Sequence, residues 1–384
     1  MRILMLNYEF PPIGGGAGEI SRHIAEGLAS RGHYVHVLTA GLKDAPDSVV
    51  ENDVQVTRLK SKRKYQYQSN PREMVSWMRM AKKFLRTHLK LNEYNICFAH
   101  FALPGGEVAY SMKNAFGLPY VVMSHGHDIP WFFPKQMFVY HALTYQWIRK
   151  IVINSQKLFV QSDAMETNAR SFLGKKHYGL VCQIPNGWDA GFFYPAKQRS
   201  DGAFQLVFPG RLVKQKDPFT LLKAVRLVRK DIPDMQVQIL GDGPLRKSMQ
   251  AYVRKYNLAE TVRFEGWVDK KRMRQAYQQA DVVVLPSLNE GMSMATLEAM
   301  ACGAYLLVTD VSRNADLIET GVNGDIIPPS DFNHLAEAIV DYYKTKYPEY
   351  RVPVSVFEKL NAYYAWEQVV NKYDNVLKEI SRVR

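Results

Sequence analysis

The residues best suited to chemistry follow apolar, strand-like runs. In VFPGRLVKQKDP, Gly210 and Arg211 come directly after such a run, and Lys216 lies five residues beyond the arginine. Arginine offers a planar fork of hydrogen-bond donors and lysine a mobile positive charge, a combination that binds a diphosphate and stabilises it as a leaving group. This loop therefore predicts a site for a phosphate-rich substrate, although arginine and lysine are also common on plain surfaces.

Two carboxylates follow the run DVVVLP, in PSLNEGMSMATLEAMACG, where seven residues separate Glu290 from Glu298. A helix beginning near Met292 would place Glu298 about 9 Å along its axis, so the acids are spaced to hold two ends of one ligand. The free N–H groups around Met292, Ser293 and Met294 would point at phosphate or sugar hydroxyls. Helix capping and solubility are the alternative explanation for the two acids.

A glycine-rich loop follows the first apolar run. Gly14, Gly15, Gly16 and Gly18 lead into a helix that we expect to begin near Ala17. Such a loop brings bare N–H groups and a helix N-terminus to an anionic group, with Gly15 and Gly16 as the candidate contacts, but it can equally be a structural turn. The spacing is neither GxGxxG in the right frame nor a Walker motif, which argues against NAD or ATP at this position.

His125, His127 and Asp128 follow another apolar run, YVVMS. A His-x-His pair on an extended segment would point both rings the same way, as metal ligands do, but no third ligand is evident nearby. We therefore expect no metal here and a polar site with one histidine facing a substrate. A purely structural loop is the alternative.

Length and composition predict a globular, two-domain protein. The chain has 384 residues, 47% of them hydrophobic and 23% charged, which excludes intrinsic disorder. Cys97, Cys182 and Cys302 form no CxxC pair, so a reducing cytoplasm fits better than a disulfide framework. The first apolar run is broken by Asn7 and Glu9, and no later run is long enough to span a membrane.

The positive charge is concentrated in the first half. The net charge is +13, and residues 58–90 alone hold eleven Lys and Arg against one acid. Apolar residues recur at helical spacing within this segment, which predicts a basic amphipathic helix. A helix with its apolar side in the core competes with a patch on an anionic membrane, and a nucleic-acid site comes third because no nucleic-acid motif accompanies the charge. The membrane patch would comprise Lys62, Arg63, Lys64, Trp77, Lys82, Lys83 and Arg86.

Apolar strand-like runs alternate with helical stretches along the whole chain, which predicts two doubly wound α/β domains with parallel sheets. A Gly- and Pro-containing stretch places the boundary near residues 188–202, between domains at 1–190 and 200–364. Ligands of such sheets lie beyond the carboxyl ends of the strands, so two domains facing one another would bind substrates in the cleft between them. The expected strands are RILMLNY, HYVHVLTA, DVQVTRL, NICFAHF, YVVMSHG, KLFVQS and VCQIPNG, then FQLVFPGRL, MQVQILGDG, TVRFEGW, DVVVLPS, YLLVTD and GDIIPP.

Together these motifs resemble the retaining glycosyltransferases of family 4, which have the GT-B fold of two Rossmann-like α/β domains. The resemblance covers nearly the whole chain. It rests on the glycine loop, HGHD at 125–128, IPNGWD at 184–189, the GR-x4-K loop, ILGDGP at 239–244 and the E-x7-E pair. The last segment, about 365–384 and including Trp366, resembles the helix that crosses back onto the first domain in this family.

The resemblance implies an N-terminal acceptor-binding domain and a C-terminal donor-binding domain. Arg211 and Lys216 would bind the donor pyrophosphate, Glu298 the ribose hydroxyls, and Glu290 with the amides of residues 292–294 the transferred sugar. His125 would face the reacting centre, so that the catalytic set is His125, Arg211, Lys216 and Glu290. The donor-binding set is Gly15, Gly16, Arg211, Lys216, Glu290, Met292, Ser293, Met294 and Glu298.

His127 and Asp128 would lie on the acceptor side. The family retains the anomeric configuration by transfer on one face of the sugar, so no protein nucleophile is implied, in agreement with the missing pair of carboxylates for double displacement. No cofactor and no metal is expected. The sequence has no Asp-x-Asp, the usual device for holding a divalent ion on a nucleotide diphosphate in the other common glycosyltransferase fold.

The expected substrates are a nucleotide-linked hexose, with UDP favoured over GDP by the resemblance, and a glycan or lipid-linked glycan acceptor. The expected location is the cytoplasm, with peripheral binding to the membrane through residues 58–90. Two alternatives stay open: a soluble sugar-phosphate acceptor held by the same cations, and a nucleotide-sugar-binding protein without catalysis. The intact Arg211, Lys216, Glu290 and Glu298 count against the latter. Nucleic acid is not expected as a partner.

Overall fold

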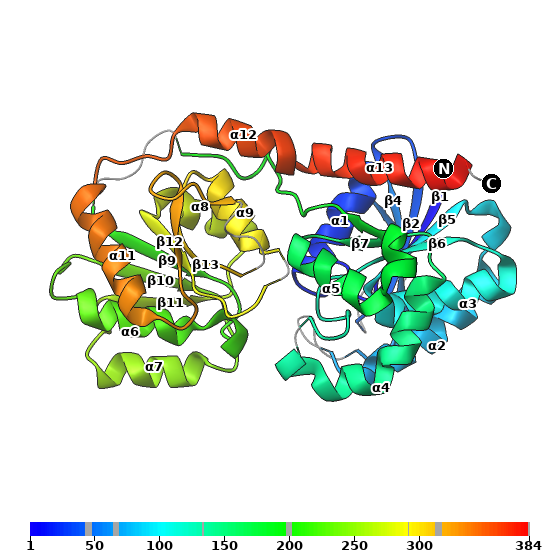
Figure 1. Cartoon of the computed structure of the whole chain (residues 1–384), viewed down its shortest axis with the longest axis horizontal. Helices are drawn as coiled ribbons and strands as arrows, with labels where there is room; N and C mark the ends of the chain where they lie inside the picture. Colours follow the sequence, from blue (N-terminus) through cyan, green and yellow to red (C-terminus); the bar gives the residue numbers. More distant parts are fainter. Residues whose placement is uncertain are drawn as a thin grey trace. The chain divides into compact units, whose positions relative to one another are not determined.

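A computed structural model describes residues 1–42, 48–63, 69–132, 134–196, 202–290, 292–311 and 317–382, with the side chains of 134–137 left aside. The chain forms two compact units, shown in Figure 1. Unit 1 comprises Met1–Asn186 and Trp366–Arg384, and unit 2 comprises Gly187–Ala365. The break falls just ahead of the expected 188–202 segment, because Trp188 already donates its backbone N–H to the carbonyl of Tyr364 (2.9 Å) within unit 2.

Unit 1 is built on an eight-stranded sheet with the order β3-β4-β2-β1-β5-β6-β7-β8. All neighbours are parallel except β3, which runs antiparallel to β4. The strands are β1 (Arg2–Leu6), β2 (Tyr34–Gly41), β3 (Ser48–Glu51), β4 (Val54–Lys60), β5 (Ile96–His100), β6 (Tyr120–Met123), β7 (Leu158–Val160) and β8 (Val181–Gln183).

Helices connect these strands and bury their apolar sides on the sheet. In α2 the Asn70 side chain accepts from the N–H of Glu73, and the Glu73 carboxylate accepts from the N–H of Asn70. This capping box fixes where the helix begins, and its inner side buries Trp77, Ala81 and Leu85. The helices of unit 1 are α1 (Gly16–Ala29), α2 (Pro71–His88), α3 (Glu107–Phe116), α4 (Pro134–Ile153), α5 (Asp163–Leu173) and α13 (Trp366–Arg382).

Unit 2 has a six-stranded parallel sheet with the order β11-β10-β9-β12-β13-β14. Its strands are β9 (Gln205–Pro209), β10 (Gln236–Leu240), β11 (Val262–Gly266), β12 (Val282–Leu285), β13 (Tyr305–Thr309) and β14 (Gly324–Ile327). Its helices are α6 (Pro218–Val228), α7 (Arg246–Lys255), α8 (Lys270–Gln279), α9 (Met294–Ala301), α11 (Phe332–Thr345) and α12 (Val354–Tyr364).

The predicted fold class is confirmed, since every expected apolar run contains a strand. The sequence did not reveal β3, because SVVE is a short edge strand with no buried residue. Within the described parts of the chain, no helix combines the length and the apolar character needed to cross a bilayer.

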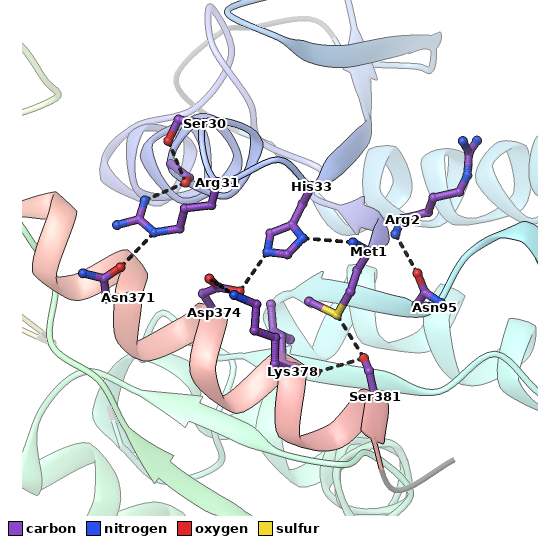
Figure 2. A network of polar contacts seen from close by, with 12 residues as sticks. Met1, Arg2, Ser30, Arg31, His33, Asn95, Asn371, Asp374, Lys378 and Ser381 are labelled. Carbon is purple, nitrogen blue, oxygen red and sulfur yellow. Dashed lines mark hydrogen bonds and ion pairs between the residues drawn. The ribbon is translucent and has the colours of Figure 1, made fainter.

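The last helix, α13, belongs to unit 1 and packs on α1. Val370 of α13 comes so close to Gly27 that a Cβ atom on the glycine would lie 2.7 Å from a valine methyl group. Polar contacts continue this interface (Figure 2): the His33 ring contacts Asp374, and Arg31 donates from Nε to the side-chain oxygen of Asn371 (2.9 Å). The two ends of the chain are thus joined within one unit.

Candidate active site

The first candidate site lies at the carboxyl ends of the unit 2 strands. The loop after β9 packs against the turn after β10, where Gly241 has φ +149° and a Cβ atom would lie 2.0 Å from the carbonyl oxygen of Gly210. Only glycine fits such a close backbone approach. Leu212 then donates its N–H to the carbonyl of Asp242 (3.0 Å), which fixes the loop that carries Arg211. The Arg211 side chain is exposed.

Lys216 and Glu290, drawn from the two separate motifs, form an ion pair. Both side chains are mostly buried, with 15% and 12% of their surface exposed. The Ser287 hydroxyl donates to the same Glu290 oxygen (3.0 Å). The backbone continues the contact, because Leu288 donates its N–H to the carbonyl of Gln215 (2.8 Å). The structure therefore places the predicted diphosphate-binding loop and the first predicted sugar-binding acid side by side.

Helix α9 begins at Met294, two residues later than expected. The reason is Ser293, whose side chain accepts from the N–H of Thr296 (3.4 Å) and so acts as the N-cap. Glu298 consequently lies about 6 Å along the helix axis from Met294 rather than 9 Å from Met292. Its carboxylate is half-buried beside the phenol of Tyr277. Burial, reinforced by this carboxylate, raises the pKa of Tyr277 well above its ordinary value.

In unit 1 the glycine loop follows β1. Gly14 has φ +100°, and Gly15 is the N-cap of α1, which begins at Gly16. Gly15 and Gly16 are exposed, and the space around the missing Cβ of Gly15 is open. An anionic group can therefore reach the first-turn amides of α1, and its binding by Gly15 and Gly16 stays a prediction.

His125 follows β6, which is separated from β1 only by β5, so it lies at the same sheet edge as the glycine loop. Its ring stacks on His100 with centroids 5.3 Å apart, and its Nε2 lies 3.1 Å from Nδ1 of His100. Burial lowers the pKa of His125 to about 3. The ring is therefore neutral near pH 7 and can exchange hydrogen bonds but cannot supply a positive charge.

The segment after β6 is a tight turn and not the extended run expected from the sequence. Gly126 has φ +95°, and Oδ1 of Asp128 accepts from the Ser124 hydroxyl (2.8 Å) and the His125 N–H (2.9 Å). Oδ2 of Asp128 accepts from the N–H of Ala102 (2.7 Å). We expected the rings of His125 and His127 to point the same way because the backbone would be extended. The turn removes that reason.

Asp128 needs a second correction. It is buried, and all three of its bonds go to its own unit, so it positions the loop and does not face an acceptor as the sequence reading had it. Burial raises its pKa, although the three hydrogen bonds oppose that shift. His127 is half-buried, and its carbonyl oxygen accepts from Nε2 of His141 (3.0 Å). Over the described residues, no three His, Cys, Asp or Glu side chains gather as a metal site would require.

Two family models match the chain. The model for Glycosyltransferase Family 4 matches residues 14–192, and the model for Glycosyl transferases group 1 matches residues 193–353. The chain belongs to the family 4 glycosyltransferases. This glycosyltransferase is 28% identical over 270 residues to the UDP-Gal:alpha-D-GlcNAc-diphosphoundecaprenol alpha-1,3-galactosyltransferase of Escherichia coli, a match that covers 66% of this chain and 67% of the relative.

Solved structures agree on the fold of the glycosyltransferase. Sucrose-phosphate synthase from Thermosynechococcus elongatus matches with a TM-score of 0.86 and 21% identity over 100% of both chains. The Anabaena protein HepE, in complex with UDP and glucose, matches with a TM-score of 0.77 and 18% identity over 98% of this chain and 99% of its own. The two parallel-sheet units and these likenesses establish the GT-B fold.

The membrane patch predicted from the sequence of this glycosyltransferase is wrong in two of its residues. Trp77 has no exposed surface and packs edge-on against Tyr8. Arg63 is also buried, and its guanidinium lies over the Tyr8 ring (4.6 Å) and pairs with Glu9. Neither can touch a membrane, and the amphipathic helix turns its apolar stripe into the core. Lys62, Lys83 and Arg86 are exposed and Lys82 is half-buried, while Lys64 lies outside the described residues.

Sequence reasoning overlooked three residues of the unit 2 site: Ser287, Gln215 and Tyr277. Ser287 contacts Glu290, and Gln215 donates from its side chain to the carbonyl of Asn289 (2.9 Å). A polar residue directly after a buried strand was the available signal for Ser287. Tyr277 carried no signal, because its place beside Glu298 depends on how α8 packs against α9.

Proposed function

We propose that the protein is a retaining glycosyltransferase that moves a hexose from a UDP-linked donor to a lipid-linked glycan at the cytoplasmic face of a membrane. The observation that carries the proposal is the contact between Lys216 and Glu290. It brings the two motifs expected to bind the diphosphate and the sugar to one sheet edge of unit 2, beyond the carboxyl ends of neighbouring strands β9 and β12.

We assign a separate task to each charged side chain of the proposed donor site. Arg211 is exposed at the loop tip and can reach both oxygens of a phosphate with its planar fork. Lys216 is already oriented by Glu290, so it supplies positive charge without a large loss of side-chain freedom on binding. Glu298 lies five residues after the N-cap of α9, and we expect it to accept from ribose hydroxyls.

Departure of the nucleoside diphosphate is the step that this site favours. Negative charge grows on the leaving group as the sugar–phosphate bond breaks, and oriented Arg, Lys and amide donors stabilise that charge. In the proposed front-face transfer the departing phosphate takes the acceptor proton, so no side chain forms a covalent intermediate. The neutral ring of His125 in unit 1 suits a hydrogen-bonding role toward the substrates, because its pKa of about 3 leaves it without a charge.

The named relatives support the choice of substrates. The similar galactosyltransferase of Escherichia coli is named for a UDP-linked donor and a diphosphoundecaprenol-linked acceptor, and the similar Anabaena structure holds UDP and glucose. A lipid-linked acceptor also suits the excess of positive charge in residues 58–90. A soluble sugar-phosphate acceptor is the second candidate, because the same cations would bind its phosphate.

Isothermal titration with UDP, GDP and ADP tests the donor site, first with EDTA and then with magnesium. We expect UDP to bind most tightly, with little change on adding magnesium, and we expect Lys216→Ala to weaken binding. Lys230→Ala, which removes an exposed lysine from the connection between α6 and β10, is the matched control. Equal affinity for the three nucleotides, or none, would overturn the donor assignment.

The stereochemistry and the acceptor are tested on the purified enzyme. Proton NMR of the product from a UDP-α-hexose should show an α linkage if the configuration is retained. Transfer to a polyprenyl-diphosphate-linked sugar is compared with transfer to a free sugar phosphate in the same buffer. Faster transfer to the free sugar phosphate would favour the second candidate, and a β product would exclude the retaining mechanism.

A further inference from the structure

Helix α4 exposes an unusual number of large apolar side chains. Val139, Leu143 and Trp147 have 69%, 81% and 41% of their surface exposed, and Phe138 has 60% exposed. Val139, Leu143 and Trp147 are spaced four residues apart, so they form one line along the outer side of the helix. We call this line, together with Phe138, the α4 outer face.

The inner side of α4 is apolar as well. Ile148, Ile151 and Val152 are completely buried in the core of unit 1. No charged residue occurs between Phe138 and Ile148, whereas a surface helix normally carries charged residues on the side away from the core. A helix that is apolar on both sides is typical of an element covered on both sides, and the outer face has no cover from the described residues.

The helices in contact with α4, and α4 itself, carry an excess of positive charge. The described side chains of α2, α3 and α4 include eight Lys and Arg against two Glu, a formal charge of +6. Contacts join the three helices, because Glu107 of α3 accepts from Nε1 of Trp147 (2.6 Å) with one oxygen and from Nζ of Lys82 (2.5 Å) with the other. Arg86 of α2 reaches Ser111 of α3 in the same way (3.5 Å). The apolar line and the cations of α2 are therefore parts of one continuous surface.

Aromatic rings stand at one end of the outer face and connect it to the loop after β6. Trp131, 36% exposed, lies 5.5 Å from the ring of Phe138. The buried His141 of α4 accepts from the N–H of Trp131 at Nδ1 (3.4 Å) and donates from Nε2 to the carbonyl of His127 (3.0 Å). These two bonds fix the tautomer of His141 and tie α4 to the loop that contains His125.

We infer that the α4 outer face is the surface with which unit 1 docks on an anionic lipid bilayer. The apolar side chains enter the boundary between headgroups and acyl chains, Trp131 and Trp147 lie at headgroup level, and the cations of α2 contact the anionic headgroups. This inference rests on the proposed lipid-linked acceptor and names a membrane surface different from the one expected around Trp77.

Charge distinguishes this occupant from a second copy of the chain. A symmetric dimer through the outer face would bring two of these net positive helix groups together, which is unfavourable without counter-charges. An anionic bilayer supplies those counter-charges along with an apolar layer. The anionic bilayer is therefore a better match than a second copy of the chain for a surface that is both apolar and basic.

Vesicle co-sedimentation tests the docking surface. We expect the full chain to bind vesicles that contain about one third phosphatidylglycerol, to bind phosphatidylcholine vesicles weakly, and to detach as salt is raised. The double variant Val139→Ser/Leu143→Ser should bind the anionic vesicles about tenfold more weakly, since it removes two membrane-facing apolar groups. Val50→Ser/Val354→Ser is the matched control, because both of these valines are about as exposed as Val139.

Three outcomes would overturn the inference: no vesicle binding by the wild type, equal binding by the double variant, or equal binding to neutral and anionic vesicles. Loss of a dimer in the double variant, seen by sedimentation velocity without vesicle binding by the wild type, would assign the face to a second copy. UDP titration on the same samples separates this inference from the proposed function. Intact UDP binding with no vesicle binding rejects only the docking surface, whereas vesicle binding without UDP binding rejects the donor assignment.

Fluorescence of Trp147 provides a second readout that does not depend on activity. When anionic vesicles are added, the emission maximum of its indole should shift to shorter wavelength, and brominated lipid should quench the emission. Trp147→Phe keeps an apolar ring and removes that signal, so the difference between the two proteins reports on this residue. An unchanged difference spectrum with vesicles present would contradict the insertion of the outer face.

Discussion

Nε2 of His33 lies 2.8 Å from Oδ1 of Asp374, and this contact joins the loop before β2 to the last helix of the chain (Figure 2). Lys378 holds the other oxygen of Asp374 at 2.8 Å. Burial tends to raise the pKa of Asp374, but hydrogen bonds from Lys378 and His33 outweigh it and hold the pKa below its ordinary value. The carboxylate is therefore ionised, and it secures α13 on unit 1.

Asp374→Ala should lower the free energy of unfolding by about 2 kcal/mol, because it leaves two polar partners without an acceptor in a mostly buried contact. Urea unfolding at pH 7 measures the change. Glu379→Ala, on the exposed side of the same helix, should have little effect. Similar losses for both variants would show that the contact between His33 and Asp374 is not important for docking α13.

Acid should destabilise unit 1 through His36. This histidine is buried between the hydroxyls of Tyr94 and Thr57, and burial lowers its pKa to about 4. In the unfolded chain it takes up a proton near pH 6.5, so the unfolded state binds more protons between pH 6.5 and 4 and stability falls as the pH falls through that window. Within this window, His36 lowers the free energy of unfolding by about 1.4 kcal/mol for each pH unit of acidification.

Urea unfolding of the wild type and of His36→Gln at pH 7.5, 6, 5 and 4.5 checks this slope. The variant should lose stability less steeply below pH 6.5, because glutamine takes up no proton. His334→Gln, at an exposed position of α11, should keep the wild-type slope. Parallel plots of unfolding free energy against pH for all three proteins would mean that His36 does not stay neutral in the folded state.

Gly241→Ala should disrupt the donor loop. The new methyl group would meet the Gly210 carbonyl at 2.0 Å with φ at +149°, so the loop that carries Arg211 must move. We expect a loss of roughly 3 kcal/mol in stability and weaker UDP binding. Gly202→Ala is the control, since its missing Cβ faces open space. Normal stability and UDP affinity in Gly241→Ala would show that the loop tolerates the displacement.

Glu298→Ala should weaken UDP binding about ten- to a hundredfold, because ribose hydroxyls would lose a charged acceptor worth roughly 1.5 to 3 kcal/mol. Isothermal titration measures it, with Glu337→Ala on the exposed side of α11 as the control. Removing the carboxylate should also lower the pKa of Tyr277, whose rise it reinforces. A folded Glu298→Ala protein with wild-type affinity for UDP would remove the ribose assignment.

Arg211→Ala should reduce kcat more than it raises KM for the donor. The guanidinium is exposed in the protein, and we expect it to act mainly on the charge that develops as the diphosphate leaves. Initial rates over a range of donor concentrations separate the two effects, and Arg254→Ala in α7 controls for the loss of one surface charge. A rise in KM alone would reduce the role of Arg211 to ground-state binding.

The main elements were predictable because the central strands, such as β1, β6, β12 and β13, are continuous apolar runs, and β4, β10 and β11 still contain the apolar residues that face a core. The same reasoning placed Arg211, Lys216 and Glu290 at carboxyl ends of strands. It did not predict that Lys216 and Glu290 touch, because this requires β9 and β12 to be neighbours, a property of strand order that local sequence does not encode.

Long-range packing also explains the errors around residues 58–90. Arg63 reads as a surface cation, yet it is buried through its contact with Tyr8 and Glu9, more than fifty positions earlier. Conversely, the sequence of α4 gave no amphipathic pattern, since the inner and the outer side of the helix are both apolar. Periodicity identifies a helix with one buried side, but it cannot distinguish the inner from the outer side when their compositions match.

Because α13 is part of unit 1, synthesis on the ribosome cannot complete the units in the order in which they are encoded. The sheet of unit 1 emerges first, but the helix that covers Gly27 and His33 is translated only after all of residues 187–365. All strands and helices of unit 2 have therefore been translated before the last helix of unit 1. Nascent unit 1 therefore carries an uncovered apolar surface while unit 2 is translated, including Phe98 of β5 and Phe159 of β7, which Tyr373 of α13 contacts in the folded protein. This is the interval in which a chaperone would bind unit 1.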